Sequence, residues 1–183
     1  MNAYSASDFA RSFRTVRKNT IQIAHDIPED QWDYRPTPEL RSVRELFSHI
    51  AALTYLPMRM HFVDRRTFMG MAEFQAYAAE AAAYAASLAT RHDVITALKT
   101  AGDEFAAALE SMTDAQLAER VNFPPPMEPS SKSRFELLLG TKEHEMHHRG
   151  QLMLILRLLG GVPHLTRERQ TRMAPPAPAP ARA

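Results

Sequence analysis

Three capping boxes mark the beginnings of helices in this sequence and constrain its fold more than any other feature. In a capping box, a Ser or Thr and an acidic residue three positions later accept hydrogen bonds from each other's backbone N–H groups. The three pairs are Ser42 with Glu45, Thr90 with Asp93, and Ser133 with Glu136. Each pair opens a segment in which apolar residues recur every three or four positions, as in a helix with one face toward a core. Residues 5–25 show the same pattern, with Ser5 or Ser7 as the capping residue at the start, so four amphipathic helices are predicted.

The connections between these helices favour an all-α fold. No stretch combines alternating apolar and polar residues with the β-branched residues of a strand. Residues 64–91, between the second and third helices, are long enough for a crossover, and their alanine-rich pattern predicts a short extra helix. We therefore predict a single four-helix bundle domain over residues 1–172. Residues 173–183 are mostly Ala and Pro and are predicted to form a disordered tail.

Composition excludes several classes of protein. The sequence has no cysteine, which removes disulfides, thiolate metal ligands and any mechanism based on a cysteine nucleophile. Its 22 basic and 21 acidic residues are spread along the chain and give a net charge of +1, so neither nucleic acid nor a membrane is an expected partner. Residues 1–18 lack the apolar core of a signal peptide, and no apolar run reaches the ~18 residues of a membrane-spanning helix. A cytoplasmic location is expected.

A histidine cluster lies inside the last predicted helix. His144 and His148 are four residues apart, so their side chains lie one above the other on one face of a helix and can share a metal ion. The two residues fall on an apolar stripe with Leu137 and Ile155, and we expect both to occupy core positions. Burying two imidazoles is costly unless something binds them. His147 is about 60° away from His144 around the helix and is the less favoured ligand.

A third histidine occupies an apolar face of the second helix. His49 follows the Ser42 capping box at a position where a core residue is expected. Taken alone, it is most simply a buried histidine with a hydrogen-bond partner, but beside His144 and His148 it becomes a candidate third ligand. Without cysteine, the remaining ligand types are His, carboxylate and water, and imidazole suits both zinc and nickel.

The spacing of the histidines in the last predicted helix also matches the H-E-x-x-H signature of zinc proteases, in which a glutamate is the general base. Here it is formed by His144, Glu145 and His148, and Glu168 downstream is a conceivable third ligand. Gln151 and Leu154 do not fit the extended metzincin motif, and no predicted strand is present to hold a peptide. A protease is therefore the weaker interpretation.

The segments around His49, His144-Glu145-Met146-His147-His148-Arg149-Gly150-Gln151 and the Gly160-Gly161-Val162-Pro163 stretch together resemble the DinB family of bacterial helical-bundle proteins. The resemblance spans roughly residues 5 to 165. It implies a four-helix bundle in up-down-down-up order, a homodimer, and His49, His144 and His148 as metal ligands. The family includes thiol-dependent isomerases and S-transferases beside members with no assigned activity.

These observations lead to two functional hypotheses. In the first, the protein is a metal-dependent transferase or isomerase that uses a low-molecular-weight thiol cosubstrate, or a hydrolase, and acts on a small molecule at a metal with open positions. Glu145 is then a candidate general base, although it can instead orient a histidine. In the second, the protein binds a metal without catalysis, as a stress-response or dimerisation module.

Overall fold

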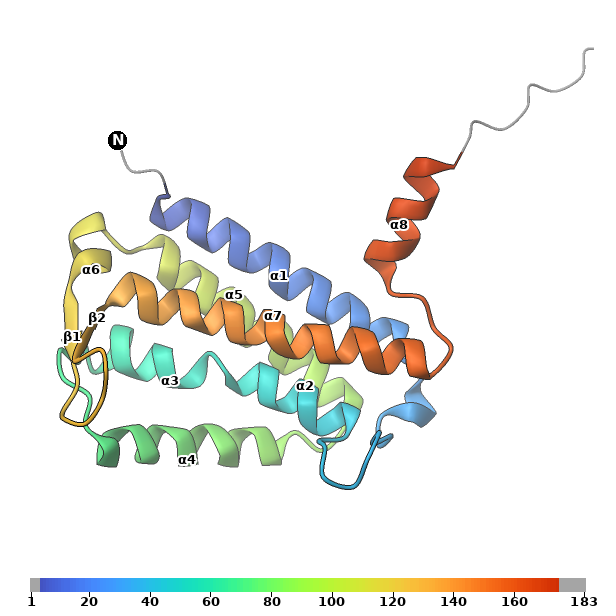
Figure 1. Ribbon diagram of the computed structural model, residues 1–183, viewed down its shortest axis with the longest axis horizontal. Coiled ribbons are helices and arrows are strands. Elements are labelled where there is room, and N and C mark those ends of the chain that lie inside the picture. Colours follow the sequence, from blue (N-terminus) through green and yellow to red (C-terminus); the bar gives the residue numbers. More distant parts are fainter. Residues whose placement is uncertain (1–3, 175–183) are drawn as a thin grey trace, which may run out of the picture.

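Four long helices form the bundle in the computed structural model, which describes residues 4–174. They are α1 (Ala6–Asp26), α2 (Val43–Ala52), α5 (Arg91–Glu110) and α7 (Arg134–Leu158). Helices α1 and α7 run in one direction, and α2 and α5 run in the other (Figure 1). The order is therefore up-down-down-up, as the resemblance implies, and the predicted four-helix bundle is confirmed.

Capping boxes begin these helices, as the sequence predicts. The hydroxyls of Ser42, Thr90 and Ser133 each accept a hydrogen bond from the backbone N–H three residues later. The acidic side chain at that later position accepts a hydrogen bond from the backbone N–H of the Ser or Thr. The first helix begins in the same way, with Ser5 as its cap and Asp8 as the partner. Each box satisfies two backbone N–H groups that the helix itself cannot, which sets where each helix begins.

The second helix is interrupted soon after it begins. Helix α2 ends at Ala52, and the chain continues through α3 (Tyr55–Pro57) into a π-helical segment, η2 (Met58–Val63). The interruption lies at Leu53 and Thr54, where Pro57 has no N–H to donate to the carbonyl of Leu53 four residues earlier. The interrupted helix still runs in one direction along the bundle, and both α2 and α3 contact α4 and α7 (Figure 1).

The crossover between η2 and α5 contains a helix that is longer than predicted. Helix α4 (Met71–Ser87) has 17 residues, and its alanines have the highest helix propensity of any residue. It packs along α2 and α3 at one side of the bundle (Figure 1). The hydroxyl of Tyr55 donates a hydrogen bond of 2.7 Å to Glu80, which holds α4 against α3.

The remaining elements lie at the ends of the bundle. They are η1 (Glu29–Gln31), α6 (Asp114–Ala118), β1 (Arg120–Asn122), β2 (Ser131–Ser133) and α8 (His164–Met173). Strands β1 and β2 form an antiparallel pair that brackets the proline-rich loop between them. The expectation of no strand is wrong in this detail, because three-residue strands are too short to show a sequence alternation.

Helix α8 projects from the bundle beyond the end of α7 (Figure 1). It is anchored to α1 by Arg167, which pairs with Asp26 at 2.9 Å, and by His164, which is 3.2 Å from the amide oxygen of Asn19. The predicted tail over residues 173–183 lies outside the described residues, except that Met173 ends α8 and Ala174 follows it. Within residues 4–174, no helix is long and apolar enough to cross a membrane.

The two largest of the three apolar clusters in the core follow one another along the bundle. One includes Ile23, Ile50, Leu98 and Leu152, and the other includes Phe9, Phe13, Phe105 and Leu138. Helices α1, α5 and α7 run the length of the bundle and contribute residues to both of these clusters. Burial of these side chains supplies the main driving force for the fold, at roughly 1.5–3 kcal/mol for each large apolar residue.

Candidate metal centre

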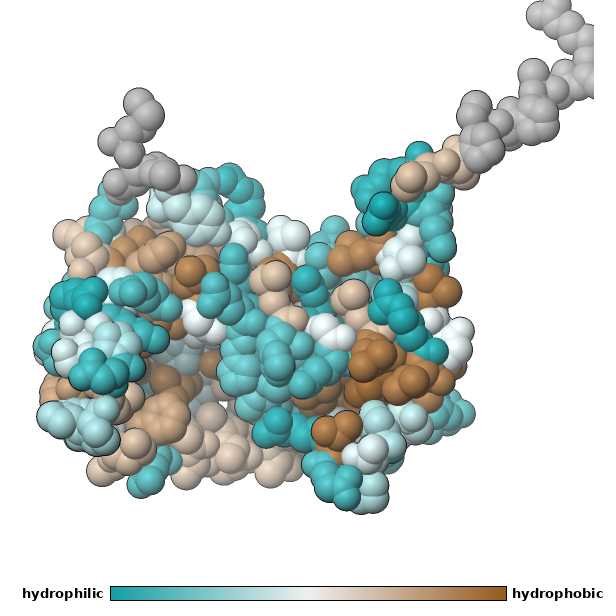
Figure 2. Space-filling view, in the orientation of Figure 1, coloured by the Kyte–Doolittle hydropathy of each residue, from teal (hydrophilic) through white to brown (hydrophobic). Residues whose placement is uncertain are grey.

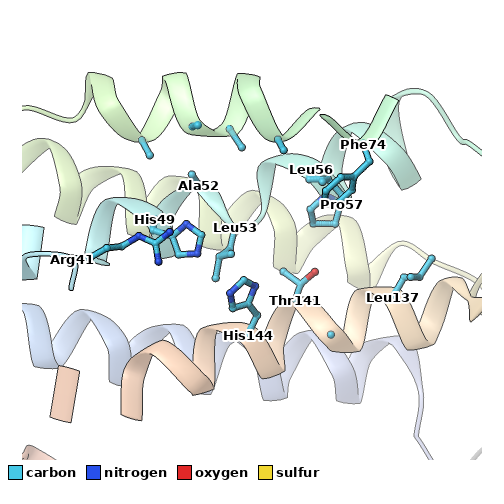
Figure 3. A pocket seen from close by; sticks show the side chains of 15 residues that line it. Arg41, His49, Ala52, Leu53, Leu56, Pro57, Phe74, Leu137, Thr141 and His144 are labelled. Atoms are coloured by element: carbon cyan, nitrogen blue, oxygen red, sulfur yellow. The ribbon is translucent and has the colours of Figure 1, made fainter. Parts of the chain in front are cut away.

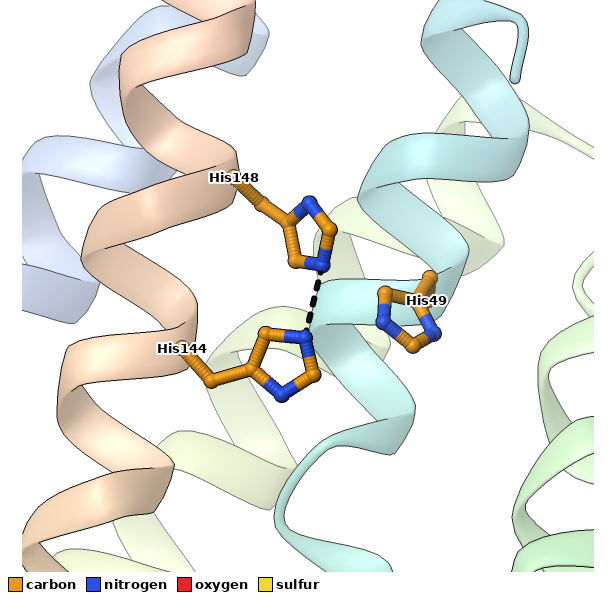
Figure 4. A group of neighbouring side chains, drawn as sticks. All are labelled: His49, His144 and His148. Carbon is orange, nitrogen blue, oxygen red and sulfur yellow. Dashed lines mark hydrogen bonds between the residues drawn. The ribbon is translucent and has the colours of Figure 1, made fainter. Parts of the chain in front are cut away.

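Three histidines from two helices face one another between α2 and α7 (Figure 4). His49 lies in the last turn of α2, and His144 and His148 lie one turn apart near the middle of α7. The packing of α2 against α7 brings these turns together. The structure brings together all three residues that the sequence suggests as ligands.

The imidazoles are close enough to hold one ion. The Nε2 atoms of His144 and His148 are 2.9 Å apart, and each of the three residues has a ring nitrogen within 4.8 Å of the others. Two nitrogens that ligate a tetrahedral zinc at about 2.0–2.1 Å lie roughly 3.3 Å apart. The rings of His144 and His148 are thus near the separation that a shared metal requires, and the ring of His49 faces both (Figure 4).

Gln151 orients the most buried of the three rings. Its side-chain carbonyl oxygen lies 2.8 Å from Nδ1 of His148 and accepts a hydrogen bond from it. The proton of His148 is therefore on Nδ1, which leaves the lone pair of Nε2 directed toward His144 and His49. The amide nitrogen of Gln151 lies 3.1 Å from His147, which is exposed and does not join the group.

Partial desolvation favours the neutral form of all three imidazoles. Desolvation, with smaller contributions from Arg41 and from the other two histidines, lowers the pKa of His49 to about 4. Burial likewise lowers the pKa of His144 and of His148 below the ordinary value for histidine. Neutral imidazoles present free lone pairs at pH 7, which is the form that binds a metal ion.

The two histidines of α7 differ in burial. His148 is 5% exposed, so its predicted core position is confirmed. His144 is exposed, and the prediction that it occupies the core is wrong. The buried face of α7 passes through Leu138, Glu145 and Leu152, which places His144 at the edge of the helix interface.

His144 and His49 instead form part of the wall of a cavity of about 470 Å³ (Figure 3). The cavity lies between α4 on one side and α2, α3 and α7 on the other. Most of its walls are apolar, and within residues 4–174 the polar side chains that line it are those of Arg41, His49, Thr141 and His144. Its size and mixed lining are typical of sites that bind small molecules.

Glu145 does not lie with the histidines. Its side chain is 1% exposed and contacts α1, where Nε of Arg17 donates to its two carboxylate oxygens at 3.0 and 3.1 Å. The hydroxyl of Thr20 donates a third hydrogen bond of 2.7 Å. The carboxylate is thus occupied by partners on α1, away from the cavity that the general-base hypothesis requires.

These polar groups form a layer between the two apolar clusters. Arg17 and Thr20 lie between Phe13 and Ile23 on α1, just as Glu145 lies between Leu138 and Leu152 on α7. The guanidinium of Arg17 also donates to the backbone carbonyl of Leu98 at 2.7 Å, which adds α5 to the network. Arg17 is not among the site residues predicted from the sequence. The available signal was the seven-residue spacing of Leu138, Glu145 and Leu152, which places an acid on the core face and requires a buried basic partner.

The fold and the site together define an up-down-down-up helical-bundle protein whose three clustered histidines can bind a metal ion. The chain belongs to the DinB superfamily, whose family model matches residues 12–152.

A curated relative and a solved structure support this assignment. The uncharacterised protein YjoA of Bacillus subtilis (strain 168) is 27% identical over 148 residues, which cover 81% of this chain and 86% of YjoA. The crystal structure of a DinB-like protein from Bacillus subtilis, also YjoA, aligns with a TM-score of 0.62 at 24% identity. That alignment covers 84% of this chain and 92% of the YjoA structure, and it shows the shared fold.

Proposed function

We propose that this protein is a metal-dependent enzyme that acts on a small molecule, with His49, His144 and His148 as ligands of a zinc or nickel ion. The observation that carries the proposal is the position of the cluster at the wall of a cavity. Within residues 4–174, the metal-ligating group contains three histidines and no fourth His, Asp or Glu. Three protein ligands beside a cavity are typical of catalytic sites, whereas structural sites have four.

A divalent ion in such a site lowers the pKa of a thiol or of a water molecule at its open position. The chain has no cysteine, so a sulfur nucleophile has to come from a low-molecular-weight thiol cosubstrate. Within residues 4–174, no carboxylate lines the cavity, which leaves imidazole and the hydroxyl of Thr141 as the nearby groups for proton transfer. This lining suits either nucleophile, because a thiolate or a hydroxide held at the ion needs no general base once its proton is lost.

For Glu145 we propose a structural role in place of general-base catalysis. Its hydrogen bonds to Arg17 and Thr20 join α7 to α1, and α7 carries two of the three histidines. A carboxylate with these buried partners fixes the rotation of α7, so that His144 and His148 face α2.

The metal dependence can be tested on untagged protein purified without chelator. We expect close to one zinc or nickel ion per chain by elemental analysis, and metal-dependent consumption of a thiol such as cysteine in the presence of 1-chloro-2,4-dinitrobenzene. Removal of the metal should lower this rate by more than about tenfold, and added zinc should restore it. Hydrolysis of p-nitrophenyl acetate, measured in parallel, distinguishes a hydrolase. A fully loaded protein that accelerates neither reaction would support the noncatalytic, metal-binding alternative.

We also propose that the protein forms a homodimer through an apolar groove beside the site. Leu40, Leu154 and Leu158 line this groove and are 51%, 59% and 59% exposed. Figure 2 shows apolar residues gathered over the C-terminal half of α7 on this face. Large apolar side chains that share an exposed groove are typical of a protein interface.

Leu158→Glu is expected to weaken this association by more than about tenfold, because it places an unpaired charge in the contact. Multi-angle light scattering should show a dimer for the unchanged protein and a monomer for the variant at the same concentration. Val63→Glu is the matched control, since Val63 is also an exposed apolar residue but lies at the end of η2. A monomeric wild-type protein contradicts the proposal.

A further inference from the structure

The cavity beside the histidines has a polar end and an apolar end (Figure 3). Arg41, His49 and His144 form the polar end, and Pro57 and Phe74 lie at the other end. A ligand that fills the cavity therefore meets a cationic side chain and imidazoles at one end and hydrocarbon at the other. This arrangement is complementary to an amphipathic molecule.

Arg41 carries the only charge in the lining of this cavity within residues 4–174, and it has no partner there. Its side chain makes no hydrogen bond or ion pair with any residue in that range, whereas two arginines close to it in the chain are paired, Arg35 with Glu45 and Arg44 with Asp33. The positive charge of Arg41 also acts on all three histidines, because it helps to lower their pKa values. The guanidinium is thus available to bind an anion beside the histidine cluster.

Small residues create the apolar part of the cavity. Four alanines of α4 line it: Ala78, Ala81, Ala82 and Ala85. Across from α4, Gly140 of α7 also lines the cavity, and a Cβ atom added there would meet no atom within 4 Å. Larger side chains at these positions would fill the space, so the small ones leave room for an apolar group to lie along α4.

We propose that the cavity binds a small carboxylate with an apolar body, whose acidic group pairs with Arg41 beside the histidines and whose apolar part lies against the alanines of α4. This assignment rests on the proposed function, because it names the class of substrate that the same site takes. Arg41 is a specificity-determining residue in this arrangement, and α4 sets the length and width of the apolar part.

Octanoate is a suitable probe, and octanamide is its uncharged counterpart. Titration calorimetry of the full-length protein should show octanoate binding, with octanamide weaker by about tenfold because its head group cannot pair with a guanidinium. Arg41→Gln should weaken octanoate binding by about tenfold and leave octanamide binding unchanged. The effect is modest because Arg41 is exposed to solvent.

The apolar part is tested by Gly140→Leu, which adds a large apolar side chain at the cavity wall, where its Cβ meets no atom within 4 Å. This substitution should lower the affinities for octanoate and for octanamide by more than about tenfold each. Gly150→Leu is the matched control, because Gly150 lies in the same helix, also has no atom within 4 Å of an added Cβ, and is outside the cavity. Both changes replace a helical glycine with a better helix former, so neither is expected to prevent folding.

Three results overturn the assignment: no binding of octanoate, equal loss of octanoate and octanamide in Arg41→Gln, or the same affinities in Gly140→Leu and Gly150→Leu. Each titration is made on zinc-loaded protein and again after treatment with chelator, and metal content is measured on the same samples. If the zinc-loaded protein retains no metal but binds octanoate, the cavity assignment is supported and the proposed metal centre fails. Metal binding without octanoate binding overturns the cavity assignment and leaves the metal centre in place.

Discussion

Glu145→Ala is expected to lower the free energy of unfolding by about 3–5 kcal/mol, the range found when one partner of a buried ion pair is removed. The substitution leaves the guanidinium of Arg17, which is 3% exposed, without its carboxylate in the middle of the core. The hydroxyl of Thr20 loses its 2.7 Å acceptor as well. Both groups are buried, at 3% and 0% exposed, so the cost of their desolvation remains.

Urea unfolding followed by circular dichroism measures this effect. Glu143→Ala is the matched control, because Glu143 lies in the same helix but is exposed, and its loss is expected to change stability by no more than about 0.5 kcal/mol. Replacing both charged partners, as in Arg17→Met with Glu145→Leu, should recover much of the lost stability because no unpaired charge remains.

The same series separates a structural glutamate from a catalytic one. Glu145→Gln keeps the shape of the side chain but removes the charge that pairs with Arg17, so we expect a clear loss of stability. A Glu145→Gln protein that unfolds at the same urea concentration as the unchanged protein, yet has lost its activity, would contradict the structural role and restore the general-base hypothesis.

The long helices could be predicted because their signals are local. A capping box involves residues three positions apart, and an apolar stripe repeats within one helix, so both are visible without knowledge of the fold. Ser42, Thr90 and Ser133 accordingly mark the beginnings of α2, α5 and α7. The helical character of α4 was also visible in its alanines, although its full length was not.

Elements held by distant partners could not be predicted in this way. Helix α8 is polar along its length, and its anchors on α1 are far away in the chain: Arg167 reaches Asp26, and His164 reaches Asn19. Strands β1 and β2 depend on pairing with each other across a proline-rich loop. No local sequence pattern predicts either α8 or the strand pair, because the stabilising contacts join residues that are remote in sequence.

The candidate site was predicted only in part. His144 and His148 are a local pair, and His49 is a candidate third ligand because of its apolar-face position in another helix, which the resemblance also implies. The rotation of α7 was misjudged because its buried face includes a carboxylate, so a purely apolar stripe placed His144 in the core and Glu145 outside it. Arg41 and the cavity depend on how α4 packs against the bundle, which the sequence alone does not specify.

Loss of the metal is the largest effect expected at the candidate site. His49→Ala and His148→Ala should each lower the affinity for zinc by more than about 100-fold, because removing a ligand costs more than the 10–100-fold typical of losing a residue that orients one. Gln151→Ala tests that smaller range directly, since Gln151 bonds to Nδ1 of His148 but is not a ligand. Competition with a chromophoric chelator gives these affinities.

Circular dichroism distinguishes loss of the metal from loss of the fold. Both ligand variants should retain most of their helicity, because the apolar clusters around Leu98 and Phe105 do not include the histidines. His147→Ala is the matched control, since His147 is in the same helix, is exposed and lies outside the group of three. Its zinc affinity should stay close to that of the unchanged protein. Unchanged zinc binding in both His49→Ala and His148→Ala would mean that the ion is held elsewhere, and the three-histidine site would then be wrong.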